Sequence, residues 1–201
     1  ALSTEKVDNI EIGGRNLIRN SSFNGGNHWS GNAEIDSEVK YSNNNTLKFQ
    51  ELDTANRVSK SIPVNSKYKA KQGDTFTLSF YVMTNDVENM SSIWLEKQPD
   101  SGYEAIGSLR IPEGTQNGEW VKMSVTYTIN GDSTRAGLYI AKLDGTTPAF
   151  WISDIKIEKG NKATDWTPAP EDVQAEIDAA IVRATYWSIK ASAPVIYKDA
   201  I

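Results

Sequence analysis

The sequence contains no cysteine among its 201 residues and only one histidine, His28. Without cysteine the chain can form neither a disulfide framework nor a thiol nucleophile. A single histidine also leaves a zinc hydrolase without its usual ligands and gives little support to a Ser-His-Asp triad. The fold must therefore be stabilised by packing alone, or by packing with help from a metal ion.

Clustered positive charge and long apolar runs are missing as well. The formal net charge is −5, which argues against nucleic acid as a partner because phosphate backbones are bound by clusters of Lys and Arg. No apolar run approaches the roughly 20 residues that a membrane helix needs, so we expect no membrane partner. Carboxylate pairs for glycoside cleavage stay open as a minority hypothesis, with Glu96 and Glu104 as loose candidates only.

Short segments with strand character make up most of the chain. In residues 73–84, Leu78, Phe80 and Val82 alternate with residues of the opposite phase, the period-2 pattern of a strand with one buried face. Phe80 is expected in the core. Further strand segments are residues 46–50, 58–64, 92–97, 120–129, 136–143 and 150–158. With a short strand that starts at Leu17 and a connector or edge strand within residues 1–12, the total is eight to nine strands without an intervening helix. This pattern predicts an all-β fold, a two-sheet antiparallel jelly-roll sandwich.

The last of these strands, residues 150–158, does not alternate cleanly. Trp151 and Ile155 belong to one phase, whereas Phe150 and Ile152 belong to the other. One extra residue in a strand shifts its phase, so a β-bulge near residues 153–154 reconciles the two sets.

The pattern changes from strand to helix after residue 168. Residues 171–186 have the pattern of a helix with one apolar side, formed by Val173, Ile177, Ala180, Ile181 and Ala184. A heptad-like spacing runs through Val173, Ile177, Ala180 and Ala184 to Trp187. Two heptads fall short of the ~3–4 that indicate a coiled coil, so we expect this chain to be monomeric in dilute solution. The expected organisation is a connector at 1–12, a sandwich module at 13–168, a helical linker at 169–186 and the first, strand-like part of a further domain at 187–201.

Four segments resemble the carbohydrate-binding modules of tail proteins from phages and prophages of Gram-positive bacteria. They are IGGRNLIRNSSF at 12–23, GDTFTLSFYVM at 73–83, the strand that opens at Trp120, and FWISDIKIEKGNKATDWTPAPED at 150–172. This family resembles the jelly-roll modules of xylanases and glucanases, in which sugar binds a concave sheet face or the loops at its rim.

The resemblance implies a non-catalytic protein of a virion tail or baseplate that binds polysaccharide at the host cell surface. It also implies other tail subunits as partners and a trimeric parent protein. The alternative left open is a spacer domain of a tail fibre without a ligand of its own.

Trp94 is the aromatic residue best placed to bind sugar. Its neighbours Ile93 and Leu95 have the phase of core residues, so Trp94 is expected on an outer face. Flat aromatic surface and planar polar groups suit sugars. The same face is expected to hold Tyr81, Tyr139, Arg57 and Glu96, with Met83, Lys122 and Ser59, while Tyr103 and Arg110 offer a second location in the loops. The alternative is that the link at 98–119 covers this face.

The resemblance further implies a structural calcium ion between the N-terminal segment and an acidic residue of the last strand. Asp154 matches that acidic residue. On the other side the family commonly has Phe-Glu, whereas here Phe23 is followed by the uncharged Asn24, which weakens such a site. Asn24 and Asp154 are the expected ligands, with backbone carbonyls near Phe23 completing the oxygen shell.

Overall fold

The structure, a computed structural model, describes residues 13–24, 29–31, 33–50, 57–60, 70–90, 92–98, 104–131, 137–142 and 148–192. Contacts divide the chain into two compact units, Ala1–Ala169 and Pro170–Ile201. The first unit contains the β-strands, and the second contains helix α1 (Pro170–Ser192).

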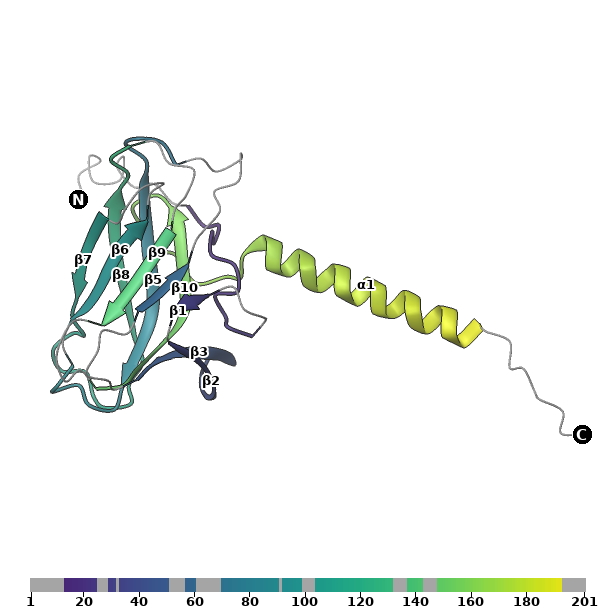
Figure 1. The fold of residues 1–201 in the computed structure, drawn as a ribbon, viewed down its shortest axis with the longest axis horizontal. Helices are drawn as coiled ribbons and strands as arrows, with labels where there is room; N and C mark the ends of the chain where they lie inside the picture. Colours follow the sequence, from purple (N-terminus) through teal and green to yellow (C-terminus); the bar gives the residue numbers. More distant parts are fainter. Residues whose placement is uncertain are drawn as a thin grey trace, which may run out of the picture. The chain divides into compact units, whose positions relative to one another are not determined.

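The described part of the first unit contains two five-stranded antiparallel sheets (Figure 1). One sheet, here called the β6 sheet, has the order β1 (Ser30–Gly31), β4 (Arg57–Lys60), β9 (Gly137–Lys142), β6 (Ile93–Gln98), β7 (Glu104–Leu109). The other, the β5 sheet, has the order β2 (Glu34–Tyr41), β3 (Asn44–Phe49), β10 (Phe150–Lys159), β5 (Thr75–Thr84), β8 (Val121–Thr128). The predicted all-β antiparallel sandwich is therefore confirmed.

The hydrophobic core lies between the two sheets. Leu78 and Phe80 of β5 and Leu95 of β6 are all fully buried, so the predicted core position of Phe80 is confirmed. The rings of Phe49 and Phe150 stack in the same core with their centroids 4.5 Å apart. Burying a side chain of this size contributes about 1.5–3 kcal/mol, and these contacts join strands that are distant in sequence.

Strand β10 contains the predicted bulge. Its register with β5 shifts between Ser153 and Lys156, and Asp154 has a φ of 51°, in the left-handed region that side chains rarely adopt. The shift lets Ile152 and Ile155, which differ in phase, both face the core, and both are fully buried.

Three described strands, the two-residue β1 and the longer β2 and β7, lie where the sequence indicated none. β2 is an edge strand of largely polar residues that are partly or fully exposed, so it lacks the apolar alternation that marks a half-buried strand. β7 lies within the 98–119 link and pairs with β6 from Ile93–Leu109 to Lys97–Glu104. Because β7 extends the β6 sheet sideways, this described part of the link does not cover the outer face of β6.

Helix α1 begins at Pro170, where a proline suits the first turn, and Glu171 and Asp172 interact favourably with the positive end of the helix dipole. The helix ends at Ser192, so the strand expected to begin at Trp187 is wrong for residues 187–192. The alternation of apolar and polar residues from Trp187 onward resembles a strand. Trp187 also continues the apolar stripe of the preceding helical turns. Residues 193–201 lie outside the described residues, and α1 is not apolar enough to cross a membrane.

Candidate functional site

Trp94 and Glu96 lie two residues apart on β6 and project from the face opposite the core. Their neighbours Ile93 and Leu95 are buried, whereas Trp94 and Glu96 are half-buried. The indole Nε1 of Trp94 donates a hydrogen bond to Oε1 of Glu96 over 2.6 Å. This bond orients an aromatic surface and a carboxylate relative to each other on the outside of the sheet.

Neighbouring strands bring other predicted site positions to the same face. Trp94 pairs with Ala141 of β9, and Ala141 pairs with Arg57 of β4. Glu96 pairs with Tyr139 of β9. Residues directly opposite each other in an antiparallel pair share a face, so positions 57, 94, 96 and 139 lie together on the outer face of the β6 sheet.

Tyr81 lies on the other sheet. It belongs to β5, and its ring stacks on that of Tyr41 with the centroids 4.2 Å apart. The expectation that Tyr81 shares a face with Trp94 is therefore wrong, and the same holds for Met83 of β5 and Lys122 of β8. Strand alternation separates inner from outer residues, but a sandwich has two outer faces, and alternation does not assign a residue to one of them.

Of the two predicted loop residues, the structure describes only Arg110. It is exposed and directly follows Leu109, the β7 residue that pairs with Ile93. Arg110 therefore lies at the rim of the β6 sheet, one position beyond the strand pairing. Tyr103 lies outside the described residues.

The two expected calcium ligands, Asn24 and Asp154, are connected through a third residue. Nδ2 of Asn44 donates a hydrogen bond to Oδ1 of Asp154 over 2.6 Å, and Nδ2 of Asn24 donates to Oδ1 of Asn44 over 3.1 Å. Oδ1 of Asn24 in turn accepts a hydrogen bond from the backbone N–H of Asn45. Amide groups therefore bridge the two residues.

In this arrangement both expected calcium ligands are engaged by amide groups of the protein. Calcium takes six to eight oxygen ligands, but here an amide N–H group points at the Asp154 carboxylate and Asn24 directs its oxygen to the backbone. Among the described residues, no group of three or more acidic or histidine side chains could hold a metal. Burial raises the pKa of Asp154, and the hydrogen bonds from Asn44 and Ser153 only partly offset this rise.

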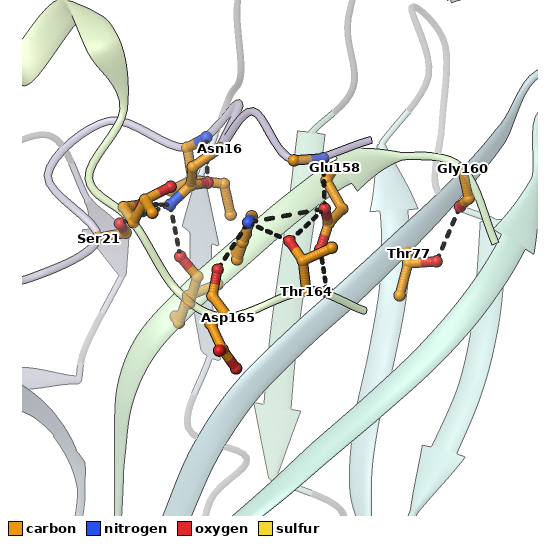
Figure 2. A network of polar contacts seen from close by, with 12 residues as sticks. Asn16, Ser21, Thr77, Glu158, Gly160, Thr164 and Asp165 are labelled. Atoms are coloured by element: carbon orange, nitrogen blue, oxygen red, sulfur yellow. Dashed lines mark hydrogen bonds and ion pairs between the residues drawn. The ribbon is translucent and has the colours of Figure 1, made fainter. Parts of the chain in front are cut away.

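A buried polar network, here called the terminal latch, connects residues 13–21 to residues 155–167. Oε2 of Glu158 accepts hydrogen bonds from the backbone N–H of Gly14 over 2.7 Å and from the Thr164 hydroxyl over 2.8 Å (Figure 2). Lys156 donates to the Thr164 hydroxyl and to the Asp165 carbonyl. Burial raises the pKa of Glu158. The hydrogen bonds that its carboxylate accepts from Thr164 and Gly14, together with the Lys156 charge, outweigh this effect and hold the pKa below its ordinary value.

Asn16 and Trp166 complete the terminal latch. Nδ2 of Asn16 donates to Oγ of Ser21 and to the carbonyl of Thr167 (Figure 2), and Nε1 of Trp166 donates to the same Ser21 oxygen. At Gly13 a Cβ atom would overlap the carbonyl oxygen of Lys159, so this position requires glycine. The segments GGRN and ATDWTP are therefore two halves of one contact.

Comparison with known proteins agrees with this architecture. A family described as "Carbohydrate binding domain" matches residues 15–146, which is more than half of the chain. A search of the curated proteins found no match.

Solved structures with the same fold include two family 22 carbohydrate-binding modules and part of a phage protein. The C-terminal family 22 carbohydrate binding module of Clostridium thermocellum Xyn10B has 15% identity and a TM-score of 0.57, covering 77% of this chain and 100% of that one. The CBM22-1 xylan-binding domain of Paenibacillus barcinonensis Xyn10C has 15% identity and a TM-score of 0.53, covering 76% and 99%.

The enzymatically active domain of bacteriophage CBA120 tailspike protein 4 has 10% identity and a TM-score of 0.51. That match covers 72% of this chain but only 21% of the tailspike chain. At these identities the structural likeness shows the fold alone. The family match covers β6, the strand that carries both Trp94 and Glu96, and the chain belongs to the carbohydrate binding domain family.

Proposed function

We propose that this protein binds polysaccharide on the outer face of the β6 sheet, with Trp94 as the aromatic surface on which a sugar ring stacks. The observation that carries the proposal is the Trp94–Glu96 hydrogen bond on an outer face of a carbohydrate binding domain. An indole offers apolar surface to the C–H face of a pyranose, and a carboxylate accepts hydrogen bonds from hydroxyl groups. By strand register, positions 57 and 139 lie on the same face of the sheet.

We further place this binding at the tail of a phage particle, where it aids adhesion to polysaccharide on the surface of a Gram-positive host. Two observations support this context: the resemblance of residues 12–23 and 150–172 to phage tail modules, and the fold shared with part of a phage tailspike. Other tail subunits are then its protein partners. Single sugar sites are weak, and several copies on one particle raise the overall affinity.

A non-catalytic role is favoured over glycoside cleavage by the position of Glu104. Oε2 of Glu104 lies 2.8 Å from Nζ of Lys97 on β6. Lys97 directly follows Glu96, so the two β6 side chains point to opposite faces of the sheet. Glu104 and Glu96 therefore lie on opposite faces of the sheet, and Glu104 does not complete a carboxylate pair with Glu96. Glycosidases need two carboxyl groups facing one substrate.

The test is a glycan array followed by calorimetric titration with wall polysaccharide from a Gram-positive bacterium. Trp94→Ala should weaken binding at least about tenfold, because buried aromatic anchors dominate such interfaces, while its melting temperature stays close to that of the wild type. Tyr81→Ala, which changes an aromatic residue on the other sheet, is the matched control and should bind normally. Equal loss in both variants would place the site elsewhere, and no binding to any glycan would favour the spacer hypothesis.

A further inference from the structure

Helix α1 carries an unusual amount of exposed apolar surface. Within the described residues, every exposed large hydrophobic residue except Ile35 lies on this helix, and Ile177 and Trp187 are 48% and 62% exposed. Contiguous exposed apolar surface of this kind marks an interaction site. An isolated helix is also only marginally stable in water unless packing covers an apolar face.

The exposed residues form a seam with coiled-coil spacing. Val173, Ile177, Ala180, Ala184 and Trp187 follow one another in alternating steps of four and three residues, the spacing that aligns apolar side chains along one side of paired helices. The sequence predicted a monomer because this stripe spans only about two heptads, fewer than the ~3–4 that indicate a coiled coil. Since α1 continues to Ser192, the last seam residue, Trp187, lies inside the helix with a full turn after it.

The charges of α1 are divided between its two halves. Glu171, Asp172, Glu176 and Asp178 lie in the N-terminal half, and the basic residues Arg183 and Lys190 lie in the C-terminal half. Two parallel helices would bring the acidic halves together. Two antiparallel helices place each acidic half beside a basic half and also oppose the helix dipoles favourably.

We propose that α1 is a dimerisation helix, which pairs antiparallel through this seam with α1 of a second copy of the chain. In the register with greatest overlap, Ile177 lies opposite Trp187 of the second copy, and Ala180 lies opposite Ala184. Two-fold symmetry repeats both layers. In this register Glu176, beside the seam, approaches Lys190 of the second copy at both ends of the pair.

The opposite side of α1 provides an internal control. Val182, Tyr186 and Ile189 form a shorter apolar stripe there, and Val182 is 68% exposed. This stripe is confined to the C-terminal half of α1, so an antiparallel copy would meet it with its polar N-terminal half. The seam, by contrast, runs through both halves.

Sedimentation of the whole 201-residue chain over a range of concentrations tests the proposal. The wild type should be a reversible dimer, and Ile177→Ser should raise its dissociation constant at least about a hundredfold, because two buried Ile side chains are lost per dimer. Val182→Ser, a similar change on the opposite side, should leave dimerisation unchanged. A monomer at every concentration, a trimer, or equal effects of the two variants would overturn the proposal.

Charge exchange tests the orientation. Glu176→Lys and Lys190→Glu should each raise the dissociation constant about tenfold at low salt, because each replaces two attractive contacts with repulsive ones. The double variant should regain wild-type affinity only if the two residues face each other between copies. Additive weakening in the double variant would show that the helices do not pair antiparallel in this register.

Discussion

Lys156 and Glu158 form an ion pair inside the protein, with Nζ and Oε2 3.6 Å apart and both side chains almost completely buried. Each charge also has hydrogen bonds to the polypeptide that follows β10. Burying two charges is costly unless the remaining donors and acceptors are satisfied. The terminal latch meets that condition, and the first prediction tests how much it contributes.

Glu158→Gln should destabilise the protein by about 3–5 kcal/mol, because it leaves the Lys156 charge buried without its partner. An amide group also turns an N–H donor toward the donors of Gly14 and Thr164. Chemical denaturation measures the change. Lys162→Gln, an exposed charge in the adjoining turn, is the control and should be nearly neutral; a neutral Glu158→Gln would contradict the role given to the terminal latch.

The pH dependence of stability should carry the signature of Glu158. Its pKa in the folded protein is below the ordinary value of 4.5, so the unfolded chain binds this proton more readily than the folded one. The contribution of Glu158 is therefore present above pH 4.5 and is lost as the pH falls through the lowered folded value. Denaturation midpoints measured from neutral pH into acid should fall less steeply in Glu158→Gln than in the wild type.

Asp154 should show the opposite sign. Burial raises its pKa above the ordinary value of 3.8, so its contribution to stability is greatest below pH 3.8 and decreases as the pH rises through the raised value. Asp154→Asn keeps an oxygen that can accept from Asn44 and tolerates the left-handed backbone. This variant should be at least as stable as the wild type at pH 7, with an advantage that grows as the pH rises from about 4.

The same position tests the calcium prediction. If the amide contacts of Asn44 replace a metal ion, a chelator should leave the melting temperature of the wild type unchanged. Asn44→Ala should destabilise the protein by about 1–3 kcal/mol, because Asp154 loses its buried donor. A calcium-dependent rise in melting temperature that Asp154→Asn abolishes would show that Asp154 binds the metal after all.

Phe80→Ala should cost about 3–5 kcal/mol of folding stability, because the side chain is completely buried between the two sheets and its removal leaves a cavity. Ile35→Ala, which removes an exposed apolar side chain from the edge strand β2, should change stability by no more than about 0.5 kcal/mol. Calorimetric unfolding compares the two variants. A mild effect of Phe80→Ala would mean that the core tolerates or refills the space.

Features of the fold that follow from the alternation of side chains along a single strand were predicted from the sequence. Alternation in β5 placed Phe80 in the core, and the conflict of phases in β10 predicted the bulge beside Asp154. β2 was missed because an edge strand with a polar exterior has no apolar alternation. Trp187 was misassigned because a short segment can match strand and helix periods at once.

The sequence did not show to which of the two sheets each strand belongs, and this limited the prediction of the site. Trp94 and Glu96 share a face because they lie on one strand, which the period of two already implies. Tyr81 has the same outward phase but belongs to the other sheet, and only the long-range pairing decides that. The buried Lys156 and Glu158 were also missed, since their burial depends on residues 160–167 folding back over the strand.

The terminal latch determines how the module responds to a pull on the chain. A tensile load from the preceding residues enters near Gly14 and Asn16, and a load toward the C-terminus leaves near Thr164 and Thr167, which are bonded to the same group of side chains. The force therefore takes a short path across a few hydrogen bonds that must break together. Of the described strands, only β10, which carries Lys156 and Glu158, lies on this path, and the others should bear little tension until the terminal latch ruptures.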